Sequence, residues 1–210
     1  MSYRHFFVII CMIFMVSGCQ KAEEQQRFIM PDIVVAVAPF TQPTQTTELL
    51  AGFIPEEQKK IPEATLNELT DIFHKKLHSE KHHYVFLRKA DIQGDLARDE
   101  RGRRSALITW AERAKKAGAD MIIVPHAVLL QERVGSKVGA VTPAAINEDF
   151  YLIDAREPVT LVTRCHFSEE QKSLASDITR IGSFFKRGGW ITAQELAAEG
   201  MDKAVREFGL

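Results

Sequence analysis

Asp71, His74 and His78 are the side chains whose types and spacing come closest to a metal site. Their spacings of three and four residues would place them on one face of a helix. Two imidazoles and one carboxylate supply three ligands suited to zinc, with the fourth position left to water or to His82. A metal-dependent hydrolase built on these residues is therefore one hypothesis. Lysine and glutamate side chains surround them, as on a solvated helix face, and we predict that no metal is bound.

Other patterns that carry catalytic chemistry are absent from the sequence. It contains no HExxH zinc motif, no GxSxG nucleophile turn, no phosphate-binding loop, no CxxC pair and no glycine-rich dinucleotide turn. His126 and His166 are solitary, and a hydrogen-bonded structural role is the favoured interpretation of each. We therefore predict a protein that is not an enzyme and that needs no cofactor.

Three cysteines, Cys11, Cys19 and Cys165, set the limits of thiol chemistry in this chain. Residues 159–167 alternate as a strand does, so we expect Cys165 to face the core and His166 to face the opposite side of the sheet. The imidazole could not activate the neighbouring thiol from there. The sequence therefore predicts a buried, unreactive Cys165.

The amino-terminal segment has the features of a bacterial export signal. Arg4 and the free amine are positive, residues 6–16 form an uncharged apolar run, and small residues precede Cys19. The run is about 11 residues long, whereas a helix needs about 20 to cross a bilayer. We predict a signal peptide over residues 1–18 and no transmembrane span. The alternative is an ordinary cleaved signal followed by a chance cysteine.

The tetrad Val16-Ser17-Gly18-Cys19 resembles the lipobox of bacterial lipoproteins. The resemblance implies that a diacylglyceryl group is joined to the Cys19 sulfur, that the chain is cut before this residue, and that the new amine is acylated, for example with palmitate. Several acyl chains on one residue make a lasting anchor. By that family's sorting rule, Gln20 favours the inner leaflet of the outer membrane, with the protein facing the periplasm. Residues 19–30 would be the lipidated tether.

The rest of the chain, residues 31–210, is predicted to form one domain. Its apolar and charged fractions are those of an ordinary globular protein, and its length is enough for a substantial core. Loss of Arg4 with the signal leaves 26 cationic and 28 acidic side chains, a formal charge of −2. Nothing in this balance points to nucleic acid as a partner.

Hydrophobic periodicity predicts an α/β domain of order βαβαβββαα, a single mixed sheet flanked by helices. The predicted strands are residues 33–40, 84–87, 121–130, 146–153 and 159–167, and the first two helices are residues 63–79 and a segment that ends at Gly118. Residues 154–158 would turn a hairpin between the last two strands. Capping boxes at Ser168 with Gln171 and at Thr192 with Glu195 predict two C-terminal helices. Pro125 implies a bulge or an edge position in its strand.

Apolar residues also occur in two connections, residues 49–55 and residues 184–190. Such residues either pack under the fold or form a contact patch on the surface. Aromatic side chains are frequent hot spots of protein interfaces. We therefore name Phe53, Ile54, Phe184 and Trp190 as candidate partner contacts.

Three segments resemble a superfamily of bacterial envelope domains: residues 33–40 (IVVAVAPF), 114–128 and 150–167, together about a fifth of the chain. The superfamily comprises the curli-secretion lipoprotein, the amino-terminal domain of the Tol-system periplasmic protein, and lipoprotein activators of penicillin-binding proteins. The resemblance implies a non-catalytic, protein-binding accessory in cell-envelope assembly, secretion or peptidoglycan synthesis. A structural lipoprotein without a specific partner is the third hypothesis.

One departure from the curli-type channel is visible in the sequence. Each strand of its membrane-spanning hairpins needs roughly 9 to 11 alternating residues. Residues 41–60 and 131–145 are too short, too polar or too broken by glycine and proline to supply them. We therefore do not expect a pore.

Overall fold

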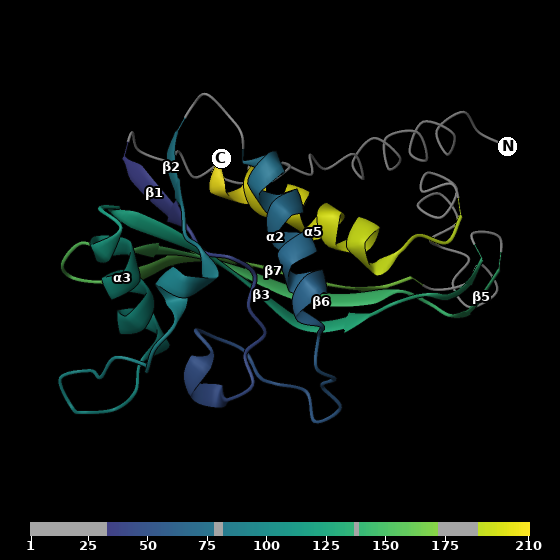
Figure 1. Ribbon diagram of the computed structural model, residues 1–210, viewed down its shortest axis with the longest axis horizontal. Helices are drawn as coiled ribbons and strands as arrows, with labels where there is room; N and C mark the ends of the chain where they lie inside the picture. Colours follow the sequence, from purple (N-terminus) through teal and green to yellow (C-terminus); the bar gives the residue numbers. More distant parts are fainter. Residues whose placement is uncertain (1–32, 78–81, 137–138, 172–188) are drawn as a thin grey trace, which may run out of the picture.

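The computed structural model describes residues 33–77, 82–136, 139–171 and 189–210. The predicted signal peptide, Cys19, the tether and Phe184 lie outside these ranges, as does the body of the first predicted C-terminal helix. Within the described part the fold class is as predicted, a mixed sheet with helices on both faces (Figure 1). Among these residues no helix is both long enough and apolar enough to cross a lipid bilayer.

The main sheet has the strand order β2-β1-β3-β6-β7. Its strands are β1 (Val34–Val37), β2 (His83–Phe86), β3 (Met121–Gln131), β6 (Ala145–Asp154) and β7 (Thr160–Glu170). β1 pairs in parallel with β2 and β3, whereas β3, β6 and β7 pair antiparallel. β1 is an interior strand, since it has a neighbour on each side. Its fully buried β-branched residues fit that position.

Three described helices cover the sheet: α2 (Glu63–Lys76), α3 (Ala106–Lys116) and α5 (Ala193–Phe208). α2 and α5 lie together on one face, over a core that includes Phe73, Phe150 and Phe208 (Figure 1). α3 lies on the other face, where Trp110 and Tyr151 belong to a second core. The 3-10 helices η1 (Thr46–Glu48) and η2 (Lys89–Ile92) lie in the connections.

Two predicted helix boundaries are confirmed. Gly118 follows α3 with a φ of 74°, a left-handed conformation that favours glycine after a helix. Thr192 and Glu195 form the expected capping box at the start of α5. The Thr192 hydroxyl accepts a hydrogen bond from the Glu195 amide at 3.1 Å, and the Glu195 carboxylate accepts one from the Thr192 amide at 2.8 Å.

The other predicted capping box, at Ser168 with Gln171, is wrong. Ser168 lies within β7 and pairs with Asn147 of β6, so the chain is still a strand there. Gln171 is buried and holds the chain on either side of Trp190. Its amide donates to the Gly189 carbonyl at 2.8 Å, and its side-chain oxygen accepts from the Ile191 amide at 2.8 Å.

Two short strands that the sequence did not predict continue the long hairpin of β3 and β6. β4 (Val134–Ser136) and β5 (Gly139–Thr142) form a separate two-stranded ribbon. Their side chains are exposed or only half-buried, so no core-facing alternation marks them in the sequence. The irregularity expected at Pro125 lies slightly further along, where the pairing of β3 with β6 shifts between Ala127 and Leu129.

A carboxyl group is buried where α5 packs on β6. Glu148 is fully buried, and neither of its side-chain oxygens has a hydrogen-bond partner among the described residues. This burial raises the pKa of Glu148 well above its ordinary value. Gly200 of α5 makes the space for it. A Cβ at that glycine would lie 2.4 Å from Glu148 Oε2 and 2.6 Å from a ring carbon of Phe167.

Candidate partner-binding site

A row of polar side chains crosses three strands on the α3 face of the sheet. His126 of β3 pairs with Asp149 of β6, and Asp149 pairs with His166 of β7. Paired residues of neighbouring strands point to the same face, so the three side chains come together. Tyr151 and Arg164 form the adjacent pair on the same face. The hairpin of β6 and β7 therefore builds most of this cluster.

Asp149 is the centre of the cluster. Its side chain is 4% exposed, and its Oδ1 accepts hydrogen bonds from Arg164 Nε at 2.8 Å and interacts with His166 Nδ1 at 2.8 Å. The Arg164 Nη2 lies 2.7 Å from the same oxygen. The guanidinium supplies the positive charge that a buried carboxylate requires. Arg164 and His166 themselves remain 31% and 47% exposed, so this side of the cluster reaches solvent.

Tyr151 and His126 form the buried side of the cluster. Their rings meet edge to face, with centroids 5.3 Å apart, and burial lowers the pKa of His126 to about 4. The imidazole is therefore neutral at neutral pH. Burial raises the pKa of Tyr151, whose hydroxyl donates to the Ala51 carbonyl at 2.9 Å. This hydrogen bond joins the sheet to the connection that covers it.

That connection carries the Phe53 loop, which we define as residues 49–55. Gly52 has a φ of 90°, and a Cβ there would lie 3.1 Å from Arg164 Nη2, so the backbone crosses directly over the polar cluster. Gln58 fixes the segment that follows, since its side-chain amide donates to the Val128 carbonyl at 2.8 Å. The loop is therefore held to the sheet at several points. Phe53 projects from it with 74% of its surface exposed.

The cysteine next to the polar cluster in sequence does not reach it. His166 and Asp149 have the geometry of a base and its orienting carboxylate. The neighbouring thiol, Cys165, lies on the other face of the sheet and is 1% exposed, as predicted. Burial raises the pKa of Cys165 to about 12, which keeps it a thiol. The described contacts of Asp149 stabilise the hairpin and the loop.

The residues of the metal hypothesis do not come together as a described site. The His74 ring packs on Phe86 with centroids 4.3 Å apart, Asp71 is exposed, and His78 lies outside the described residues. Among the residues that the structure describes, no group of three or more His, Cys, Asp or Glu side chains is arranged to hold a metal ion.

The four residues predicted as partner contacts fall in different environments. Phe53 is exposed, and Ile54 beside it is half-buried. Trp190 is only 8% exposed, and its carbonyl accepts a hydrogen bond from Arg133. Phe184 lies outside the described residues. Of the three that are described, Phe53 presents by far the largest apolar surface.

Sequence reasoning did not single out Asp149, Tyr151 or Arg164. A signal for them was nevertheless present, because the hairpin through residues 154–158 was predicted. Counting outward from that turn puts Asp149 and Tyr151 opposite the strand that carries Arg164 and His166, but it pairs Asp149 with Thr163. The observed pairing of Asp149 with His166 depends on a shorter turn and on the register shift between Leu152 and Ile153. The covering loop gave no such signal, since its path depends on tertiary contacts with Tyr151 and Arg164.

The fold and this site define a mixed α/β domain that presents an aromatic loop over a polar cluster. No family model matches the chain, and no curated protein matches its sequence. Among solved structures, it is similar to the hypothetical protein CT253 from Chlamydia trachomatis, with 15% identity over 85% of this chain and 98% of that chain and a TM-score of 0.45.

Two further similarities involve named proteins. The PelC dodecamer from Paraburkholderia phytofirmans has 11% identity over 84% of this chain and 87% of that chain, with a TM-score of 0.47. Lipoprotein GNA1162 from Neisseria meningitidis has 11% identity over 75% of this chain and 95% of that chain, with a TM-score of 0.40. All three are distant likenesses, and we derive the function from the residues of this chain.

Proposed function

We propose that this protein is a bacterial lipoprotein, anchored through Cys19, that acts as a non-catalytic, protein-binding accessory in the cell envelope. Its processes would be envelope assembly, secretion or peptidoglycan synthesis, and Gln20 favours the periplasmic face of the outer membrane. The anchor rests on the lipobox tetrad and the export signal before it. The binding role rests on the Phe53 loop.

The observation that carries the proposal is the 74% exposure of Phe53 on a loop that is fixed to the sheet. An exposed phenylalanine gains free energy when a partner covers it, since apolar burial contributes roughly 25 cal/mol per Å². The Tyr151 and Gln58 hydrogen bonds hold the loop backbone in place before binding. A loop that is already ordered loses less conformational entropy when a partner docks, which favours affinity.

The polar cluster supports a non-catalytic role. Asp149 Oδ1 is occupied by Arg164 and His166, and Gly52 crosses directly over the guanidinium. Buried charge of this kind is costly unless it is paired, and here the pair sits under the loop and positions it. The cluster thus acts as the support of a binding surface.

The test compares two truncations of exposed apolar side chains in the lipid-anchored protein. Phe53→Ala removes the proposed anchor residue, whereas Val141→Ala removes a side chain that is 88% exposed on β5. In-cell cross-linking, affinity purification and mass spectrometry should recover a partner with the wild type and with Val141→Ala. Recovery should fall at least about tenfold with Phe53→Ala, the loss expected of an aromatic hot spot.

Two results would contradict the proposal that Phe53 binds a protein partner. Equal recovery from both variants would show that Phe53 is not a contact. No partner from the wild type, with only the solubility of Phe53→Ala altered, would favour a structural lipoprotein. Thermal unfolding of both variants should match the wild type, because neither side chain belongs to a core.

A further inference from the structure

The three described helices end near the amino-terminal end of β1, at one end of the strands of the sheet. His83, the first residue of β2, pairs with Val34 of β1, and α2 precedes that strand. The Asp120 amide, just after α3, donates to the Val34 carbonyl at 3.0 Å. Lys76, the last residue of α2, forms an ion pair with Asp202 of α5 at 2.5 Å, so the carboxyl-terminal part of α5 lies at the same end of the sheet. Figure 1 shows the carboxyl end of α5 beside the starts of β1 and β2.

We call this surface the tether end, and the last turns of its helices are rich in cations. They carry Lys75, Lys76, Arg113, Lys115, Lys116 and Arg206. Cations are favoured at the carboxyl end of a helix by its dipole. Lys76 and Lys115 form ion pairs, and the Arg113 guanidinium lies 4.5 Å over the Trp110 ring. Lys75, Lys116 and Arg206 are exposed, and none forms an ion pair with a described residue.

Most acidic groups of the tether end form ion pairs with neighbouring cations. Four of them are in ion pairs: Asp154 with Arg156, Glu157 with Lys115, Asp202 with Lys76, and Glu207 with Lys203. The hydrogen bond to Asp154 is the main cause that raises the pKa of Arg156, and Asp120 makes a smaller contribution, so this one cation faces two carboxylates. The charge that this surface leaves exposed to a partner is therefore positive, although the whole chain carries a formal charge of −1.

We propose that the tether end docks on an anionic lipid surface. This inference rests on the lipid anchor of the proposed function. Only residues 20–32 separate Cys19 from Ile33, a stretch that spans at most about 50 Å. An anchor of that reach holds the tether end at high effective concentration beside the headgroups. Lysine and arginine side chains near such a surface are attracted to it, an effect that added salt weakens.

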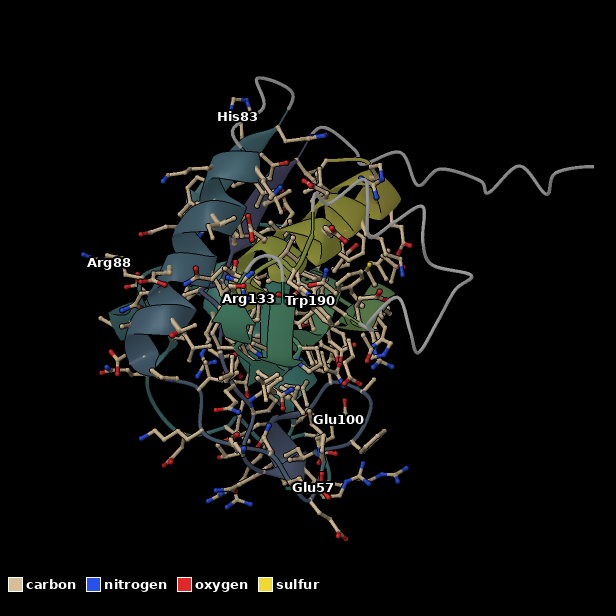
Figure 2. The ribbon with its side chains drawn as sticks, turned by 90° about the vertical axis from the view of Figure 1, so that its right-hand side faces the viewer. Glu57, His83, Arg88, Glu100, Arg133 and Trp190 are labelled. Carbon is tan, nitrogen blue, oxygen red and sulfur yellow. The ribbon has the colours of Figure 1, made fainter. Side chains whose placement is uncertain are left out.

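Docking in this orientation would leave the Phe53 loop free for a protein partner. Figure 2 shows His83 and Glu57 at opposite ends of the molecule. His83 belongs to the tether end, and Glu57 follows the Phe53 loop by two residues. The membrane would thus hold one end of the domain, and Glu57, just after the Phe53 loop, would lie at the other end.

The experiment measures which end of the anchored domain approaches the bilayer. The lipidated full chain, carrying Cys165→Ser, is reconstituted in vesicles of phosphatidylcholine with or without phosphatidylglycerol. A donor fluorophore is placed at His83→Cys or at Glu57→Cys, both exposed positions, and the acceptor is on the lipid headgroups. Energy transfer should be strong from position 83 and weak from position 57. The position-83 signal should fall in pure phosphatidylcholine and in high salt.

Charge reversal supplies the matched control. Lys75→Glu with Lys116→Glu and Arg206→Glu should lower the docked population at least about tenfold, as expected for three surface cations. The control variant, Lys59→Glu with Lys60→Glu and Arg101→Glu, changes the net charge by the same amount at exposed positions outside the tether end. It should leave the energy transfer from position 83 unchanged.

Two failures can be told apart. If Cys19→Ala retains palmitate, or the wild type leaves the vesicles, the anchor is wrong and the docking inference falls with it. The protein could instead stay on the vesicles while the energy transfer from position 83 is the same with and without phosphatidylglycerol and with and without the three charge-reversing substitutions. That result would overturn the docking inference alone. Loss of a cross-linked protein in that same variant would then assign the cations to an acidic partner.

Discussion

Glu148 shows at the scale of one residue how burial sets an ionisation state. The carboxyl group is fully buried between β6 and α5, and neither oxygen has a described hydrogen-bond partner. Ionisation there would leave an unpaired charge in an apolar interface, which costs much more free energy than the neutral acid. The raised pKa of Glu148 follows from this burial.

We predict that Glu148→Gln weakens the pH dependence of stability. The folded protein holds this proton above the pKa of the unfolded chain, so Glu148 lowers the free energy of unfolding as the pH rises above about 4.5. The amide does not titrate. Urea unfolding should show that the substitution raises the free energy of unfolding more at pH 8 than at pH 5. An equal effect at both pH values would contradict the account.

Cys165 provides a second residue-scale prediction. Its thiol is 1% exposed, and burial raises its pKa to about 12, so almost no thiolate is present at pH 8. An aromatic disulfide reagent should therefore leave the folded protein, in its proposed lipidated form, unmodified and should react with one thiol in denaturing urea. Cys165→Ser should give no signal in either condition. Fast reaction without urea would refute the buried position.

Strand alternation explains why the sequence predicted the burial of Cys165 but not that of Glu148. The run from residue 159 to residue 167 alternates, and this period placed the thiol on the core side. A glutamate at an inward position of β6 contradicts the same rule. Its burial depends on the space that Gly200 leaves in α5, a contact between residues far apart in the chain.

At the scale of elements, Gly200 sets how closely α5 can approach the sheet. Glycine within a helix costs roughly 1 kcal/mol relative to alanine, so helix propensity alone predicts a more stable Gly200→Ala variant. The contact predicts the reverse, because the new Cβ would lie 2.4 Å from Glu148 Oε2 and 2.6 Å from the Phe167 ring.

We therefore expect Gly200→Ala to lower the free energy of unfolding by about 1–3 kcal/mol, the usual cost of overpacking. Urea unfolding measures it. Adding Glu148→Ala should recover part of the loss, since one of the two contacted side chains is then truncated. A variant more stable than the wild type would show that α5 does not pack as described.

Elements with a clear period or cap were predictable, and elements fixed by tertiary contacts were not. α2, α3 and α5 begin or end where proline, glycine or a capping box marks them. The residue types at Ser168 and Gln171 matched a capping box by chance, but the chain at Ser168 is a strand that pairs with β6. β4 and β5 are short and exposed, so no alternation with the core identified them.

At the scale of the whole molecule, the proposed account gives the two ends of the domain different tasks. The tether end, with its exposed cations, would face the lipid that we propose is joined to Cys19. The Phe53 loop lies over Tyr151 and Arg164 on the α3 face of the sheet, and Glu57, just after the loop, lies at the end of the molecule opposite His83 (Figure 2). The sequence alone indicated the anchor and the aromatic residue. The position of that aromatic residue on the α3 face depends on the fold.

Site-specific photo-cross-linking in living cells tests the binding surface most directly. A photoreactive amino acid is placed at Phe53 and, as the control, at Val141, which is 88% exposed but lies on β5. The account predicts a discrete cross-linked protein from position 53 that is absent from position 141. No cross-link from position 53, or the same products from both positions, would contradict the claim that the Phe53 loop binds a protein partner.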